Sequence, residues 1–170
     1  MAYFIKYDIQ SPPVSNEKVN IVPTFTLRGI GLDIRNTSGD VLEVAWDQSV
    51  YIDEDGNSSR LIKANVSLAE KDRPQPNTVI PPGTKLQETV FPVDHVQQVN
   101  GKWQEVPLLP EKAYLYEPGF EREMRAAIGD YYHPGTKLLA GKEVRLFLRL
   151  LAGDQKQNVT IPFKIADMVQ

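Results

Sequence analysis

The sequence of 170 residues predicts an all-β fold, an antiparallel β-sandwich with one short helical insertion. The first observation behind this prediction is a pair of apolar rows at every second position near the end of the chain. The second is a series of about eight short strand patterns, each bounded by turn residues. The third is that no long stretch shows apolar residues at helical spacing. Short strands joined by turns are typical of a sandwich rather than of a fold that alternates helices and strands.

The two apolar rows flank a polar turn at 153–157. They consist of Val144, Leu146, Leu148 and Leu150, followed by Val159, Ile161, Phe163 and Ile165. Because successive side chains of a strand point to opposite faces, each row gives its strand one apolar face and one polar face. The sequence therefore predicts a hairpin over 143–165 whose apolar face needs a second layer to cover it.

The N-terminal region predicts two strands separated by a loop. Apolar and polar residues alternate over 3–9, and the prolines at 12–13 end this strand because proline donates no ladder hydrogen bond. We expect residues 14–23 to form a loop. A second strand runs over 25–34, and its apolar phase slips near Gly29, which predicts a β-bulge.

The middle of the chain predicts further short strands with turns between them. Asp-Gly between two apolar runs is a hairpin signal, and Pro-Gly fits the centre of a type II turn. The expected elements are a strand at 42–46, a hairpin with strands at 50–52 and 60–62 around a turn at 53–57, a loop at 71–77, a turn at 81–84 and an irregular strand at 86–93.

A less regular stretch at about 100–134 predicts an insertion in this single domain, which spans 1–170. Residues 100–118 suggest a long connection with at most one short strand. A short helix is expected at 120–128, because Phe120, Met124 and Ile128 form one apolar stripe and Gly129 suits the position after a helix end.

Composition excludes several classes of function. The net charge is −3 and the basic residues are scattered in sequence, so no nucleic-acid partner is expected. The chain has no cysteine, which excludes disulfides, zinc bound by cysteine and a thiol nucleophile. No apolar run reaches the roughly 20 residues that span a bilayer. We predict no cofactor, because no phosphate-binding glycine loop or nucleophile motif is present.

Four segments of strand and turn residues resemble immunoglobulin-like domains of small bacterial envelope lipoproteins, most of them without an assigned function. The segments are Leu32–Thr37, Val44–Asp47, Tyr51–Gly56 and Val79–Thr84. The resemblance covers roughly 32–93 and the final hairpin, and 100–132 has no counterpart in it. It implies an immunoglobulin-like sandwich and a non-enzymatic, extracytoplasmic binding or structural role. It implies no catalytic residues.

The first residues leave two locations open. Met1 and Ala2 lead directly into a strand pattern. In a bacterial lipoprotein a small residue such as alanine often follows the lipidated cysteine, so the chain fits the soluble part of a protein held in the cell envelope by an N-terminal lipid. In that case the missing lipid is the only membrane attachment. The alternative is a cytoplasmic protein whose native start is Met1.

Aromatic residues gather in the insertion and give the predicted binding surface. They are Trp103, Tyr114, Tyr116, Tyr131 and Tyr132. Aromatic side chains on loops anchor protein partners or stack on sugars, so we expect an envelope protein or a glycan as the partner. The alternative is that these side chains close the end of the sandwich as part of the core.

Two weaker sets of residues suggest a metal site. Asp53, Asp55 and Asn57 surround Gly56 and supply oxygen atoms of the kind that calcium binds, but the same residues are what a hairpin turn needs. The second set consists of the two histidines, His95 and His133, with Asp94 and Asp130. No spacing rule joins these histidines, so the sequence predicts exposed loop histidines instead.

The competing functional class is a hydrolase or carbohydrate-active enzyme that uses loop carboxylates. A glycosidase needs only two carboxylates at a suitable separation. Glu117, Glu121 and Glu123 are the candidates. Glu121 also lies four residues before Arg125, which is the spacing of an ion pair on a solvated helix face.

Overall fold

The computed structural model describes residues 2–109, 113–115 and 141–169, with side chains for 9–109 and 141–166. It confirms the all-β class, and every pair of strands in it is antiparallel. The strands are β1 (Ala2–Gln10), β2 (Val14–Ser15), β3 (Val19–Thr26), β4 (Gly29–Asn36), β5 (Leu42–Val44), β6 (Val50–Ile52), β7 (Ser58–Lys63), β8 (Thr78–Ile80), β9 (Lys85–Pro92), β10 (Val96–Val99), β11 (Lys102–Glu105), β12 (Ala113–Leu115), β13 (Glu143–Ala152) and β14 (Gln155–Val169). Three short 3₁₀ turns accompany them: η1 (Trp46–Gln48), η2 (Leu68–Glu70) and η3 (Val93–His95). In the described ranges, no helix is long and apolar enough to cross a membrane.

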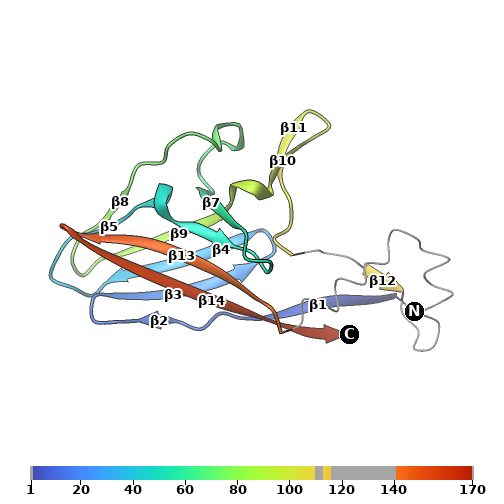
Figure 1. Ribbon diagram of the computed structural model, residues 1–170, viewed down its shortest axis with the longest axis horizontal. Helices are drawn as coiled ribbons and strands as arrows, with labels where there is room; N and C mark the ends of the chain where they lie inside the picture. Colours follow the sequence, from blue (N-terminus) through green and yellow to red (C-terminus); the bar gives the residue numbers. More distant parts are fainter. Residues whose placement is uncertain (1, 110–112, 116–140, 170) are drawn as a thin grey trace.

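Twelve of the described strands form one sheet that curls into a half-barrel (Figure 1). Its order is β12-β1-β14-β13-β6-β7-β9-β4-β3-β2, and β5 pairs with both β13 and β8. The short strand β6 pairs with β13 on one side and β7 on the other, so it links the two halves of the sheet. The strands β10 and β11 form a separate pair.

The concave side of the half-barrel holds the main core. Both apolar rows of the predicted final hairpin lie there, and each of their residues is at most 4% exposed, which confirms that hairpin. The rings of Phe25 on β3 and Phe163 on β14 lie 5.2 Å apart between centroids, so the two halves of the sheet pack on each other. Trp46 is fully buried, and its Nε1 donates to Thr78 Oγ1 at 2.7 Å.

The prediction of a loop at 14–23 is wrong, because this stretch contains β2 and the first part of β3. Val19 and Ile21 are fully buried and alternate with more exposed residues, which is the pattern of a strand. Pro23 lies within β3 and does not interrupt it. β2 pairs with Asn20 and Ile21 of β3 and does not extend as far as Pro23. On that edge of β3 the N–H that proline lacks would have no strand partner, so its absence is not costly.

The predicted β-bulge near Gly29 is also wrong. The change of phase comes from a tight hairpin turn, in which Leu27 and Arg28 join β3 to β4 and Thr26 pairs with Gly29. Gly29 has φ +146°, and a Cβ there would lie 3.2 Å from the carbonyl oxygen of Val90. Glycine therefore allows both the backbone conformation and the close approach of β9.

The remaining middle elements are confirmed, except that the strand predicted at 42–46 ends at Val44 and Trp46 begins η1. β6 and β7 form the predicted hairpin, and Leu42, Val44 and Trp46 are all buried. The turn at 81–84 has the predicted form, since Thr84 N donates to Pro81 O at 3.2 Å and Gly83 has φ +73°. The predicted helix at 120–128 lies outside the described residues.

Candidate functional site

The strands β10 and β11 form a hairpin that projects from the half-barrel, and we call residues 96–105 the arm (Figure 1). Asn100 and Gly101 join the two strands, with φ values of +51° and +77°. Positive φ at both central residues is the geometry of a type I′ turn, which Asn-Gly favours. The prediction of at most one short strand in 100–118 is wrong, because β11 and β12 both lie in this range. The Asn-Gly pair was the sequence signal for the arm.

The base of the arm is fixed to the body of the protein. Val96 is buried against Ile62 and Phe91 in a small apolar cluster on the outer side of β7 and β9. After the arm, Val106 N donates to His95 O at 2.8 Å, and Leu108 N donates to Leu27 O at 2.9 Å. The arm therefore extends from a rigid support, although all residues from Gln97 to Glu105 are exposed.

Trp103 on β11 is the large aromatic side chain that the arm presents. It is 40% exposed, and Val99 near the tip is 38% exposed. The ammonium Nζ of Lys71 lies 5.7 Å from the centroid of the Trp103 ring and 3.0 Å from Asp72 Oδ1. A cation over an indole ring is attracted by the negative charge density of the ring face. Lys71 therefore holds one side of the ring while a large part of the side chain stays open.

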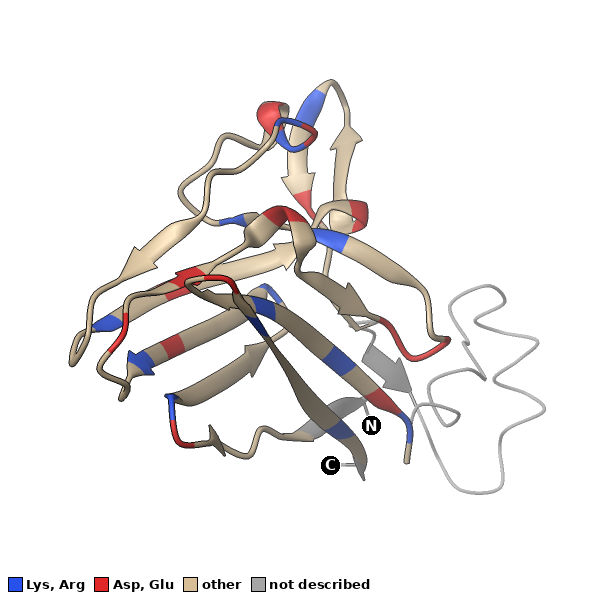
Figure 2. Ribbon diagram, turned by 60° about the vertical axis from the view of Figure 1, so that its left-hand side comes forward, with Lys and Arg blue, Asp and Glu red and all other residues tan. Residues whose placement is uncertain are grey.

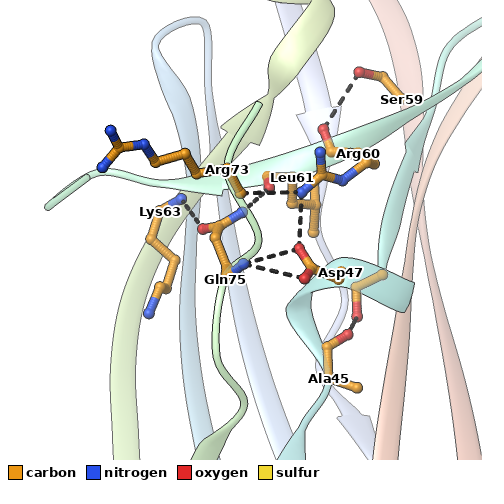
Figure 3. A network of polar contacts seen from close by, with 9 residues as sticks. Ala45, Asp47, Ser59, Arg60, Leu61, Lys63, Arg73 and Gln75 are labelled. Atoms are coloured by element: carbon orange, nitrogen blue, oxygen red, sulfur yellow. Dashed lines mark hydrogen bonds and ion pairs between the residues drawn. The ribbon is translucent and has the colours of Figure 1, made fainter. Parts of the chain in front are cut away.

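A polar network positions the loop that bears Lys71 (Figure 3). The Asp47 carboxylate accepts from Gln75 N at 3.1 Å and from Arg60 Nη2 at 2.8 Å. The same Arg60 nitrogen donates to Arg73 O at 3.3 Å. These contacts tie the end of the 64–77 loop to η1 and β7, so the loop has a defined position beside the arm.

The side chain of Gln75 completes this attachment. It is 6% exposed and lies against β7, where its Nε2 donates to Leu61 O and its Oε1 accepts from Lys63 N at 3.1 Å (Figure 3). Those two backbone groups lie just beyond the last residue of β7 that pairs with β6. The side-chain amide therefore gives these two backbone groups of β7 the hydrogen-bond partners that β6 supplies to the preceding residues.

The predicted aromatic surface is only partly described. Trp103 lies on the arm, as stated above. Tyr114 lies in β12, where its backbone pairs with Tyr3 of β1 at one end of the large sheet, whereas β10 and β11 form the separate projecting pair (Figure 1). Tyr116, Tyr131 and Tyr132 lie outside the described residues. The surface formed by all five residues stays a prediction. Trp103 is the member of this set whose side chain the structure describes.

The residues considered for calcium form a hairpin turn in the structure. The Asp53 carboxylate accepts from the backbone N–H groups of Asp55 at 2.9 Å and Asn57 at 2.8 Å. Gly56, with φ +86°, donates its N–H to Asp53 O at 3.0 Å. Asp55 lies 3.6 Å from Lys142 Nζ. The Asp53 oxygens are thus occupied by the turn, and the described side chains contain no group of three or more His, Asp or Glu residues placed to hold a metal ion.

His95 supports the base of the arm. Its Nδ1 lies 3.2 Å from Pro107 O, and its ring meets the buried Tyr51 edge-on at 6.1 Å between centroids. His133, Asp130 and the glutamates at 117, 121 and 123 lie outside the described residues. The hydrolase reading therefore stays a prediction from sequence.

Tyr51 is the buried titratable group of the described core. It is 1% exposed, and its hydroxyl has no hydrogen-bond partner in the described part of the chain. Burial raises the pKa of this phenol, and the nearby charges of Glu54 and Asp53 raise it further. Tyr51 therefore keeps its proton near pH 7, and its ring is part of the main core.

A shallow hollow of about 730 Å³ lies on the outer face of β3, β4 and β9, where Gly31 leaves space between neighbouring side chains. The acidic residues that line it are Glu88 and Asp33, and Asp33 accepts from Gln87 Nε2 at 3.2 Å and lies 3.8 Å from Lys85 Nζ. The Asp33 carboxylate is therefore already engaged within the sheet surface. The arm is the better candidate site, because it combines exposure, a rigid base and an aromatic side chain.

The chain matches none of the protein-family models, curated proteins or solved structures with which it was compared, so the arm is identified as a candidate site by its geometry alone.

Proposed function

We propose that this protein is a non-enzymatic binding module and that the arm is its contact surface. The observation behind the proposal is Trp103, 40% exposed on a projecting hairpin whose base is fixed. Tryptophan is among the residues that contribute most to binding energy at interfaces. A rigid support also reduces the entropy lost when such a side chain is immobilised by a partner.

The geometry of the arm favours a protein partner over a glycan. The arm is a two-strand sheet, so among the strands that the structure describes none lies beside the outer edge of β10 or β11. An extended segment of another protein can add to such an edge through backbone hydrogen bonds, while a side-chain contact gives specificity. Trp103 supplies that contact, and the polar residues around it, such as Gln97 and Gln104, limit unspecific association.

The sequence resemblance supports an extracytoplasmic location for this module. We propose that the chain is the soluble part of a bacterial envelope lipoprotein and that the two facing halves of its curled sheet correspond to the two layers of an immunoglobulin-like sandwich. We also propose that a short helix follows the arm in the sequence. The partner is then another envelope protein. Labelling of the native protein with a palmitate analogue should give a lipid-modified product, and an unmodified product would contradict the anchor.

Trp103→Ala should abolish capture of the partner. The matched control is Val79→Ala, because Val79 is an apolar side chain that is 52% exposed on β8, away from the arm. We expect the wild type and the control to retain the same protein from an envelope extract and the Trp103 variant to lose it. The melting temperature should be nearly unchanged in both, since neither side chain belongs to the main core.

Two results would contradict the proposal. Equal capture by all three proteins would show that the arm is not the contact surface. Turnover of glycan or ester substrates by the wild type, lost on changing Glu117 or Glu121 to Gln, would establish the hydrolase class instead.

A further inference from the structure

The outer face of β13 and β14 presents four basic side chains. Strand alternation places Arg145, Arg149, Lys156 and Lys164 on the side opposite the buried rows. Arg145, Lys156 and Lys164 are exposed, and Arg149 is half-buried. We call these four residues the basic row. Figure 2 shows basic residues in blue along both strands.

The register places two acidic residues on this face beside the basic row, Glu143 opposite Lys164 and Glu43 opposite Leu151. None of the four basic residues forms an ion pair with an acidic residue in the described ranges, whereas Arg60, Lys85 and Lys142 elsewhere do. The four positive charges of the basic row therefore outnumber the two acidic residues beside it, in a chain whose net charge is −3.

The register of the hairpin arranges the basic row along the strand direction. Lys156 lies opposite Leu151 near the turn, and Lys164 lies opposite Glu143 at the far end of β13. The eight residue steps from Lys156 to Lys164 span roughly 27 Å at about 3.4 Å per residue. The basic row runs lengthwise along the convex side of the curled sheet. A convex surface touches a flat surface along a narrow strip, and the basic row occupies such a strip.

We propose that the basic row docks this protein on an anionic phospholipid bilayer. Anionic lipids attract basic residues held near the membrane surface, and in a fluid bilayer they can move to match cations at any spacing. The proposal concerns a different surface from the arm and does not depend on the protein partner.

The same face is less suited to a single-stranded nucleic acid. Such ligands rely on aromatic rings with open faces on which bases stack. Phe147 is the aromatic residue on the outer face of β13 and β14, and it is half-buried. The guanidinium carbon of Arg149 lies 5.9 Å from the centroid of the Phe147 ring and covers it.

Sedimentation with vesicles tests the proposal. Vesicles of equal parts phosphatidylcholine and phosphatidylglycerol should bind the wild type, vesicles of phosphatidylcholine alone should not, and added salt should weaken the binding. The triple variant R145Q/K156Q/K164Q should bind about 100-fold more weakly, because each basic residue near an anionic surface contributes roughly a factor of five.

The control is the triple variant R28Q/R35Q/K85Q, which removes the same number of exposed positive charges from the β3–β4 turn, β4 and β9. It should keep wild-type binding, and both variants should keep the wild-type melting temperature. Equal losses in the two variants would show a general charge effect and overturn the proposal. It would also be overturned if the wild type ignored the anionic vesicles, whether or not it bound an oligonucleotide or polyphosphate through the basic row.

Discussion

At the scale of single residues, Leu148 is fully buried in the row that β13 points into the concave core. Leu148→Ala should lower the free energy of unfolding by about 2–5 kcal/mol, because the lost transfer energy adds to the cost of the cavity. Denaturant unfolding measures this change. Leu151→Ala is the control, since Leu151 is half-buried on the outer side of the same strand and should cost less. Equal losses at both positions would contradict the inward orientation of the row.

Tyr51 gives a prediction about pH. A phenol whose pKa is raised in the folded state stabilises the protein fully below the unfolded pKa of about 10, and this contribution is lost as pH rises above that value. The unfolded state then releases a proton that folded Tyr51 retains. Tyr51→Phe should therefore lose less stability than the wild type when the pH is raised above about 10.

The same change should be neutral or stabilising near pH 7, because the Tyr51 hydroxyl has no hydrogen-bond partner among the described residues. Thermal melts of both proteins across this pH range make the comparison. Parallel loss of stability in the two proteins would show that other groups account for the alkaline sensitivity.

At the scale of elements, the arm and the sheet should differ in backbone protection. Among the described strands, β10 and β11 pair with each other alone and are exposed from Gln97 to Glu105, whereas β13 pairs with β14 along its whole length. Amides with few buried contacts open locally without global unfolding. Hydrogen exchange should therefore be fast in the arm and slow in β13. Equal protection of both would mean that the arm is part of the cooperative core.

Sequence patterns were sufficient to predict some of these elements and not others. The hairpin of β13 and β14 was predictable because one alternating row follows another across a turn, and both rows face the same core. The strand β3 was not, because Pro23 normally ends a strand and its harmless position depends on where β2 stops. The arm had a local signal in Asn100-Gly101, but its projection and the contact of Trp103 with Lys71 depend on the fixed 64–77 loop.

At the scale of the whole molecule, the curl of the sheet was not predictable from residue patterns. Alternation specifies which side of each strand is apolar, and this requirement is met equally by two separate sheets or by one sheet folded on itself. The link through β6, which pairs with β13 and β7, selects the second solution. The basic row could not be found from sequence either, because its residues lie on two strands and adjoin only through their register.

The contact of Gln75 with β7 has a consequence for the behaviour of the protein at high concentration. An open edge next to the apolar pair Leu61-Ile62 is the kind of segment on which another chain can build intermolecular sheet. The side-chain amide occupies the Leu61 carbonyl and the Lys63 N–H, so that edge offers no template. One glutamine from a surface loop therefore closes this part of the β7 edge to pairing with a second chain.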